Sequence, residues 1–289
     1  GNMLSMTNQL GKTTIYTYNS LNLVTGITDP KGNVTQYGYD VLGNLTSITD
    51  ASNKVTSYQY DTRGNITSIT NPLNKTTTMT YDLHNNLLTV TDPKNGTVTM
   101  TYDSLGNMLT QTDSLGKVTT FLYNNLNQLI RVIGPMGYIT QYTYDYRGNR
   151  LSISDANNNA TWFTYDYKGQ LKTITDALNN QTTMTYGGTG CSSCSGVDKL
   201  TALTDAKSHT TAYEYDLRGK LTKETDPLGK ITTYTYDNKG NLITRTSPDN
   251  KTITYSYDLN NRLIQKLYSN GTVAQFQYDD AGNMTYAGN

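Results

Sequence analysis

The chain has 289 residues, 35% of them hydrophobic, and its 23 basic side chains balance its 23 acidic ones to a formal net charge of +0. The charges are few and scattered, which argues against a nucleic-acid interface because phosphate binding needs clustered Lys and Arg. No run approaches the ~20 apolar residues of a membrane-spanning helix. We therefore expect no nucleic-acid partner and no membrane span.

Tyrosine dominates the aromatic content, with 25 copies against three Phe and one Trp. A side chain with a flat apolar body and a polar tip suits a pleated sheet that has one wet surface. Because the chain is long enough for a sizeable interior, we expect Tyr and Thr to supply much of what it buries.

A 21-residue repeat runs through the whole chain. The step between Tyr186 and Tyr215 is 29 residues, which marks an insertion of eight at about 187–197. Residues 1–289 are therefore predicted to be a single array of about thirteen units. The repeated tyrosines are Tyr18, Tyr39, Tyr60, Tyr81, Tyr102, Tyr123, Tyr144, Tyr165, Tyr186, Tyr215, Tyr236, Tyr257 and Tyr278.

The first strand of each unit ends at this tyrosine. A second large side chain, Tyr, Met or Phe, stands two residues earlier, so both lie on one face of a strand. Alternation of period two, as in residues 140–144, predicts a half-buried strand. We predict that these paired side chains are buried in the sheet and that, if Tyr102 is well buried, its replacement by Ala costs about 3 to 5 kcal/mol.

A turn with the pattern Asp-x-x-Gly follows that strand. Asp at the first position can accept hydrogen bonds from backbone amides two residues on, and Gly at the fourth tolerates a positive φ. Asn stands there in several units, and Asn is the next residue to accept this conformation. The repeat positions that we select as structural are Tyr39, Asp40, Gly43, Tyr60, Asp61, Gly64, Tyr102, Asp103, Gly106, Tyr144, Asp145, Gly148, Tyr236, Asp237 and Gly240.

A second strand and a second turn complete the unit. In the strand Leu45-Thr46-Ser47-Ile48-Thr49 the two apolar residues are three apart and would point to opposite faces of a regular strand. Either a β-bulge, which would bring both residues to one face, or a sheet with both faces partly covered would explain this spacing. The next turn starts at Asp50 and ends at Asn53.

No stretch of ten residues carries a helical apolar stripe. The predicted fold class is therefore all-β: tandem 21-residue hairpins in a long, curved or spiralling antiparallel sheet, because extended sheets twist and repeat units contact mainly their neighbours.

The motif Tyr-Asp-x-x-Gly-Asn-Leu, in Tyr39 to Leu45 and Tyr236 to Leu242, resembles the YD repeat of RHS-family proteins, as does Thr-Asp-x-x-Gly in Thr225 to Gly229. The resemblance covers the entire chain in register. It implies a structural segment of a large exported bacterial protein that forms the wall of a β-shell around polypeptide cargo such as a toxin. An extracellular structural or adhesive fibre built from such arrays is the alternative.

Further expectations follow from this resemblance. The location is extracellular or at the bacterial cell surface, and the partners are neighbouring repeats of the same or an identical chain. Surface glycans are a further partner that we consider. The chain lacks an initiator Met and starts and stops inside a repeat, so we expect it to be a segment of a longer protein.

The predicted insertion carries both cysteines, Cys191 and Cys194, as Cys-x-x-Cys. We expect a local disulfide or paired free thiols, which the fold can do without. A zinc site would need two more ligands, and redox catalysis would need a βαβ context. Half a zinc site and a redox dithiol nevertheless stay open at this point.

The repeated aspartates invite a calcium or glycosidase interpretation. However, each one occupies the first position of a turn, where local hydrogen bonding explains it. His84 and His209 have no obvious partners in the sequence and are expected to be surface residues. We therefore predict no enzyme activity, no catalytic residues, no metal site and no cofactor.

Overall fold

The computed structural model describes residues 2–8, 11–187, 199–280 and 282–288, and every regular element in these ranges is a β-strand. The strands fall in two compact units, Gly1–Gln141 and Tyr142–Asn289, which we describe separately. The predicted all-β class is confirmed.

The first unit contains β1 (Ser5–Thr7), β2 (Thr13–Tyr18), β3 (Val24–Thr28), β4 (Val34–Tyr39), β5 (Leu45–Thr49), β6 (Val55–Tyr60), β7 (Ile66–Thr70), β8 (Thr76–Tyr81), β9 (Leu87–Thr91), β10 (Thr97–Tyr102), β11 (Met108–Thr112), β12 (Val118–Tyr123), β13 (Leu129–Ile133) and the start of β14 (Ile139–Tyr144). The second contains the end of β14, then β15 (Arg150–Ser154), β16 (Ala160–Tyr165), β17 (Leu171–Thr175), β18 (Gln181–Tyr186), β19 (Leu200–Thr204), β20 (Thr210–Tyr215), β21 (Leu221–Thr225), β22 (Ile231–Tyr236), β23 (Leu242–Thr246), β24 (Thr252–Tyr257), β25 (Leu263–Tyr268), β26 (Val273–Tyr278) and β27 (Met284–Gly288).

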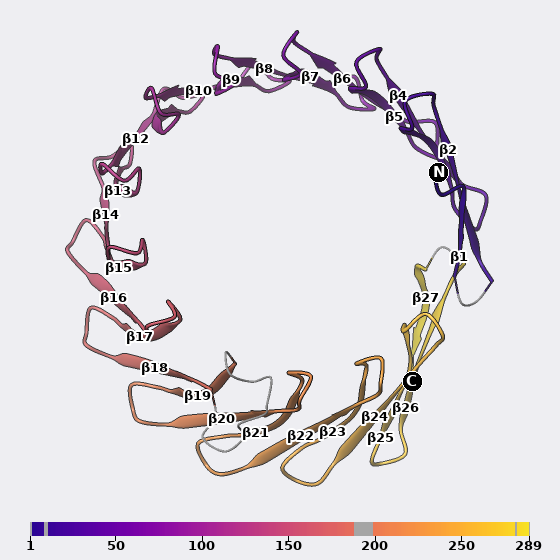
Figure 1. Ribbon diagram of the computed structural model, residues 1–289, viewed down its shortest axis with the longest axis vertical. Helices are drawn as coiled ribbons and strands as arrows, with labels where there is room; N and C mark the ends of the chain where they lie inside the picture. The colour runs from indigo at the N-terminus through magenta and orange to yellow at the C-terminus, as the bar shows by residue number, and fades with distance from the viewer. Residues whose placement is uncertain (1, 9–10, 188–198, 281, 289) are drawn as a thin grey trace. The chain divides into compact units, whose positions relative to one another are not determined.

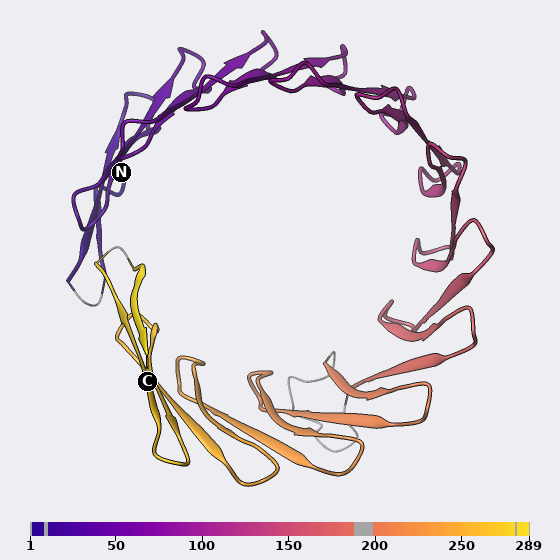
Figure 2. The ribbon, with the colours of Figure 1, turned by 180° about the vertical axis from the view of Figure 1, so that it is seen from behind.

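Within each unit, strands pair antiparallel with their neighbours in sequence. In the first unit, for example, β3 pairs with β4 and β4 pairs with β5. Contacts between elements of the described residues are all between consecutive strands. Figure 1 shows this order within the first unit as a curved run from indigo to magenta, and Figure 2 shows it from behind. Each unit is therefore a single-layer sheet, as expected for hairpin repeats that touch only their neighbours.

A β-bulge follows each first turn and resolves the spacing of the apolar residues. Between β4 and β5, Tyr37 lies opposite Ile48 and Tyr39 lies opposite Leu45, so one additional residue is accommodated in β5. The bulge puts Leu45 and Ile48 on the same face as the two tyrosines. The same shift recurs at the corresponding tyrosine of later hairpins, for example at Tyr102 and Tyr236.

The two faces of the sheet differ in exposure. In β8, Thr77, Met79 and Tyr81 are half-buried, whereas Thr76, Thr78 and Thr80 are exposed. Residues 140–144 follow the predicted faces in the same way. Threonines on the more exposed face pair across strands by hydrogen bonds, such as Thr101 Oγ1 to Thr110 Oγ1 at 2.6 Å.

The prediction that the paired large side chains of the repeat are buried is wrong. Among the described residues, the only buried apolar side chains are Met100 and Ala274, and Tyr102 is half-buried. The physical reason is that no second layer packs on either face within a unit, so the repeat tyrosines are shielded by their neighbours on the same sheet alone.

Candidate functional site: the rows of turns and tyrosines

The first turn of each repeat is held by its aspartate. Asp40 Oδ1 accepts hydrogen bonds from the backbone amides of Leu42 and Asn44, both at 2.9 Å, and Asp40 Oδ2 accepts from the Asn44 side chain. The Gly43 amide donates to the Asp40 carbonyl at 3.1 Å, and Gly43 has a φ of 87°. This is a type I turn closed by a residue in the left-handed region, a common three-residue hairpin connection.

The same arrangement recurs at the other selected turns. Asp61, Asp103 and Asp145 each accept from the amide four residues on at 2.9 Å, and Asp237 does so at 2.8 Å. A positive φ is found at Gly64, Gly106, Gly148 and Gly240, and also at the asparagines that replace glycine: Asn22, Asn85, Asn127 and Asn261.

These contacts stabilise the ionised carboxylates. The Asn65 side chain, together with backbone amides, lowers the pKa of Asp61 to about 2. The pKa values of Asp40, Asp103 and Asp145 are lowered by the corresponding asparagine four residues on. Hydrogen bonds to the charged form favour it. The turn aspartates are therefore anions engaged in local structure.

In many repeats, the tyrosine that ends the first strand links its hairpin to the preceding one. The Tyr39 hydroxyl donates to the Val24 carbonyl at 2.8 Å, and the Tyr60 hydroxyl donates to the Leu45 carbonyl at 2.8 Å. The acceptor is each time the first residue of the bulged strand, fifteen positions earlier, and we call this contact the tyrosine clamp. It also occurs at Tyr165, Tyr215, Tyr257 and Tyr278. The Tyr18 hydroxyl donates to the Met3 carbonyl, which is likewise fifteen positions earlier but precedes β1. Burial raises the pKa of the hydroxyls of Tyr60, Tyr102 and Tyr236.

The sequence reasoning missed this clamp, although the repeat contains a signal for it. The clamp position is Tyr in every unit, whereas the position two residues earlier varies among Tyr, Met and Phe. An apolar face alone would accept Phe at both positions, so the invariant hydroxyl indicates a hydrogen bond.

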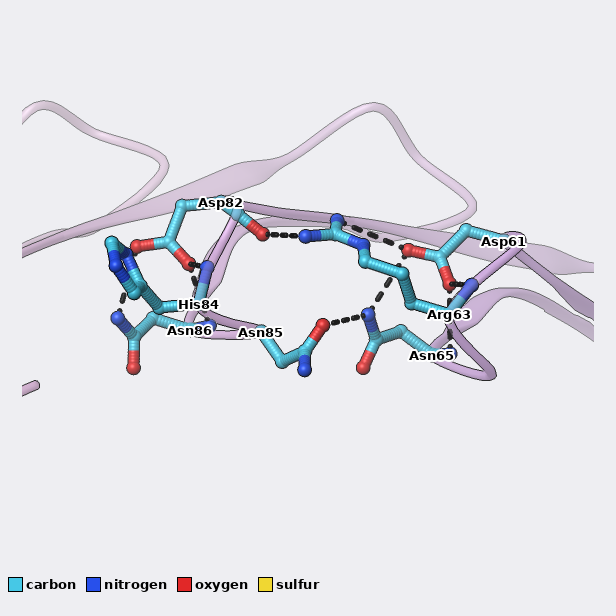
Figure 3. Close-up of polar contacts among 7 residues, drawn as sticks. All are labelled: Asp61, Arg63, Asn65, Asp82, His84, Asn85 and Asn86. Atoms are coloured by element: carbon cyan, nitrogen blue, oxygen red, sulfur yellow. Dashed lines mark hydrogen bonds and ion pairs between the residues drawn. The ribbon is translucent and has the colours of Figure 1, made fainter.

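Turns of consecutive repeats are also bridged to each other, as Figure 3 shows for two of them. The Arg63 guanidinium donates to the Asp82 carbonyl, nineteen residues on. Asn65 Nδ2 donates to Asn85 Oδ1 at 2.7 Å. Arg147 and Arg218 donate to the carbonyls of Tyr167 and Asp237, respectively. Within each unit, several consecutive first turns are therefore hydrogen-bonded to each other at one end of the strands, a feature that the sequence did not predict.

The second turns follow the same rules with one departure. Asp50 accepts from the amides of Ser52 and Lys54, and Asn53 has a φ of 59°. Ser208 occupies the equivalent left-handed position with a φ of 65°, although serine has neither the freedom of glycine nor the tolerance of asparagine there.

Shallow hollows lie between consecutive first turns. One of about 380 Å³ is lined by residues that include Tyr146, Leu151, Tyr165 and Tyr167. Two others, of about 510 and 470 Å³, occur at the turns that start at Asp103 and Asp237.

The insertion at about 187–197 lies outside the described residues from 188 on, as do Cys191 and Cys194. The hairpin that contains it keeps the regular pairing, with Tyr186 opposite Leu200 and the Gly187 amide bonded to the Lys199 carbonyl. The insertion thus leaves the register of the flanking strands intact.

The expectation that the histidines have no partners is wrong for His209, because a local turn contact pairs its ring with a carboxylate. His209 Nδ1 lies 3.0 Å from Asp205 Oδ2 in an exposed turn, and the His84 amide donates to Asp82 Oδ1. Within the ranges that the structure describes, no three His, Cys, Asp or Glu side chains gather to hold a metal ion. The same ranges contain no helix capable of crossing a bilayer.

Comparison with known protein families agrees with this geometry. The family model of the teneurin YD-shell matches residues 119–286, more than half of the chain, and that of the RHS repeat matches six overlapping segments between residues 1 and 135. No curated protein matches the chain.

Solved structures share the fold at low sequence identity. The TcdB2-TccC3 crystal structure is 17% identical, with a TM-score of 0.62 over 95% of this chain and 18% of that one. The Tc holotoxin pore of Photorhabdus luminescens is also 17% identical, with a TM-score of 0.62 over 94% of this chain. This chain therefore spans less than a fifth of the length of these relatives.

Hairpins of 21 residues, a bulge in each one and bridges between neighbours define a structural β-repeat protein. The chain belongs to the RHS and teneurin YD-shell repeat family. It is a structural β-shell repeat segment.

Proposed function

We propose that this chain forms part of the wall of an RHS-type β-shell that encloses polypeptide cargo such as a toxin, within a large exported bacterial protein. The family match and the likeness to Tc toxin structures support this proposal. The proposed location is extracellular or at the cell surface, and the proposed partners are adjoining repeats and the enclosed polypeptide.

The neighbour-only pairing of the strands is the observation that carries this proposal. Each described hairpin is tied to the preceding one by ladder hydrogen bonds, and many also by a tyrosine clamp, such as Tyr60 to the Leu45 carbonyl. A sheet of this kind can be extended by further repeats without a second layer packing on it, as the wall of a thin shell requires.

The proposed role is not catalytic. The aspartates that recur most often, such as Asp40 and Asp61, use their carboxylates for turn hydrogen bonds, and their low pKa values oppose a general-acid role near neutral pH. We propose no cofactor.

Electron microscopy of the full-length parent protein tests the proposal. We expect a closed hollow particle with density inside, and an enclosed segment that resists protease until the shell is denatured. An open filament, or an empty particle whose other segments are cut as readily in the native as in the denatured protein, would contradict the shell and favour a fibre. Fractionation of the producing cells tests the location, and retention in the cytoplasm would contradict export.

A further inference from the structure

Two consecutive first turns carry exposed aromatic rings. Tyr146 and Tyr167 stand at the second position of the turns that begin at Asp145 and Asp166, and they are 83% and 79% exposed. The remaining described first turns have no aromatic residue there: Ser20, Val41, Thr62, Leu83, Ser104, Asn125, Leu217, Asn238, Leu259 and Asp280. The repeat fold therefore does not require these rings.

The two rings flank the hollow of about 380 Å³ between their turns. Leu151 and the repeat tyrosine Tyr165 supply apolar surface to its lining, and Asp145, Asn149 and Asp166 supply polar groups. Binding sites for small ligands combine apolar surface with a few placed polar groups in this way.

Arg147 holds the arrangement in place. Its Nε donates to the Tyr146 hydroxyl at 2.7 Å, and its Nη1 donates to the Tyr167 carbonyl at 2.6 Å. The guanidinium lies 5.3 Å from the centre of the Tyr146 ring. A fixed ring loses little freedom when a ligand stacks on it.

The charges around the hollow cancel. The carboxylates of Asp145 and Asp166 and the guanidinium of Arg147 line the hollow, and the ammonium of Lys168 lies close by, 5.9 Å from the centre of the Tyr167 ring. A cationic ligand would meet Arg147, which already lies over the Tyr146 ring, and an anionic one would meet the two carboxylates. This balance favours an uncharged ligand.

We propose that Tyr146 and Tyr167 form a binding site for a neutral saccharide chain. A sugar ring has an apolar face of C–H groups that stacks on the negative face of an aromatic ring, and a polar rim of hydroxyls. The two turns are two strands apart, roughly 10 Å, which is about the length of a disaccharide. A chain running along the row of turns therefore contacts both rings.

Titration of the protein with uncharged hexasaccharides of glucose, N-acetylglucosamine and mannose, followed by ligand-observed NMR, tests this site. We expect at least one to bind, and the Tyr146→Ala/Tyr167→Ala double variant to weaken its Kd by about tenfold or more. Tyr146→Phe keeps the ring and should retain binding. Tyr138→Ala, at an exposed tyrosine in a second turn, is the matched control and should bind as the parent does.

Three results would overturn the proposal: no binding of any neutral hexasaccharide, equal weakening by Tyr138→Ala, or preferential binding of a heparin hexasaccharide that the double variant abolishes. Thermal melting followed by circular dichroism shows whether each variant is folded. If the double variant melts early, the single variant Tyr167→Ala decides, because the Tyr167 hydroxyl makes no hydrogen bond to a described residue.

Discussion

At the scale of single residues, the tyrosine clamp gives the repeat its most specific contact. Replacing Tyr60 by Phe removes the hydroxyl that donates to the Leu45 carbonyl while keeping the ring. We expect a loss of about 1 kcal/mol in the free energy of unfolding, the usual net value of one hydrogen bond. Tyr58→Phe is the control, because the Tyr58 hydroxyl has no hydrogen bond to a described residue. Equal losses for both variants in urea unfolding would contradict the clamp.

Tyr102 illustrates a residue whose energetic role the structure revises. Because its side chain is half-buried, Tyr102→Ala is expected to cost about 2 kcal/mol, below the values for fully buried aromatic residues. Chemical denaturation measures this loss, and a value above about 4 kcal/mol would show deeper burial than the sheet provides.

Ser208 is a residue whose replacement should stabilise the protein. Its φ of 65° is strained for serine, so Ser208→Asn should raise the free energy of unfolding by about 0.5 to 1 kcal/mol. Asn53→Ser, the reverse change at the equivalent turn position, should lower it by a similar amount. A melting temperature that moves the same way in both variants would show that backbone strain is not the cause.

At the scale of the hairpin, the turns were predictable and the packing was not. Asp40 and Gly43 specify their turn through hydrogen bonds and φ preferences that act within five residues, so the sequence suffices. The bulge opposite Tyr39 was left open, because the strand Leu45–Thr49 fits either solution until its partner is known. The reach of Arg63 to the next turn depends on how neighbouring hairpins stack, which no local pattern contains.

The row of turn aspartates makes the hairpins sensitive to acid. The pKa of Asp61 falls from an ordinary value of 3.8 to about 2 in the folded protein, and the pKa values of Asp40, Asp82 and Asp103 are also lowered. Because the folded-state values are depressed, this stabilisation is fully present above the unfolded pKa and is lost as the pH falls from about 4 to about 2. Urea unfolding between pH 6 and pH 2 should show this decline.

Asp61→Asn provides the comparison for the acid response. The turn at Asn124 already works with an uncharged residue, since Asn124 Oδ1 accepts from the amides of Leu126 and Gln128. The variant should therefore fold and should lose less stability below pH 4 than the parent. A parent whose stability is constant or rises between pH 4 and pH 2 would rule out this role of the aspartates.

At the scale of the whole molecule, the repeat predicts which deletions are tolerated. Removing residues 82–102 joins Tyr81 directly to Asp103, so β8 meets a first turn of the same pattern. We expect a folded protein by circular dichroism, with a smaller dependence of stability on urea because less surface is buried. Removing residues 82–91 instead deletes one turn and one strand, so that Tyr81 is followed by a second turn. The later strands of that unit would then have to run in the opposite direction relative to the strands before the deletion. This variant should unfold at a lower urea concentration than the 21-residue deletion. Equal stability of the two variants would contradict the claim that only a whole repeat can be removed without disrupting the sheet.

The pairing of strands with their sequence neighbours alone has a mechanical consequence. In an antiparallel hairpin the hydrogen bonds run perpendicular to the strands, so tension applied to the two ends of the chain peels strands apart and breaks these bonds one after another. Each repeat that opens releases roughly 70 Å of extended chain. Under force applied to one end of the chain, the sheet should therefore unfold in successive steps with small barriers, one hairpin per step, instead of crossing a single large barrier.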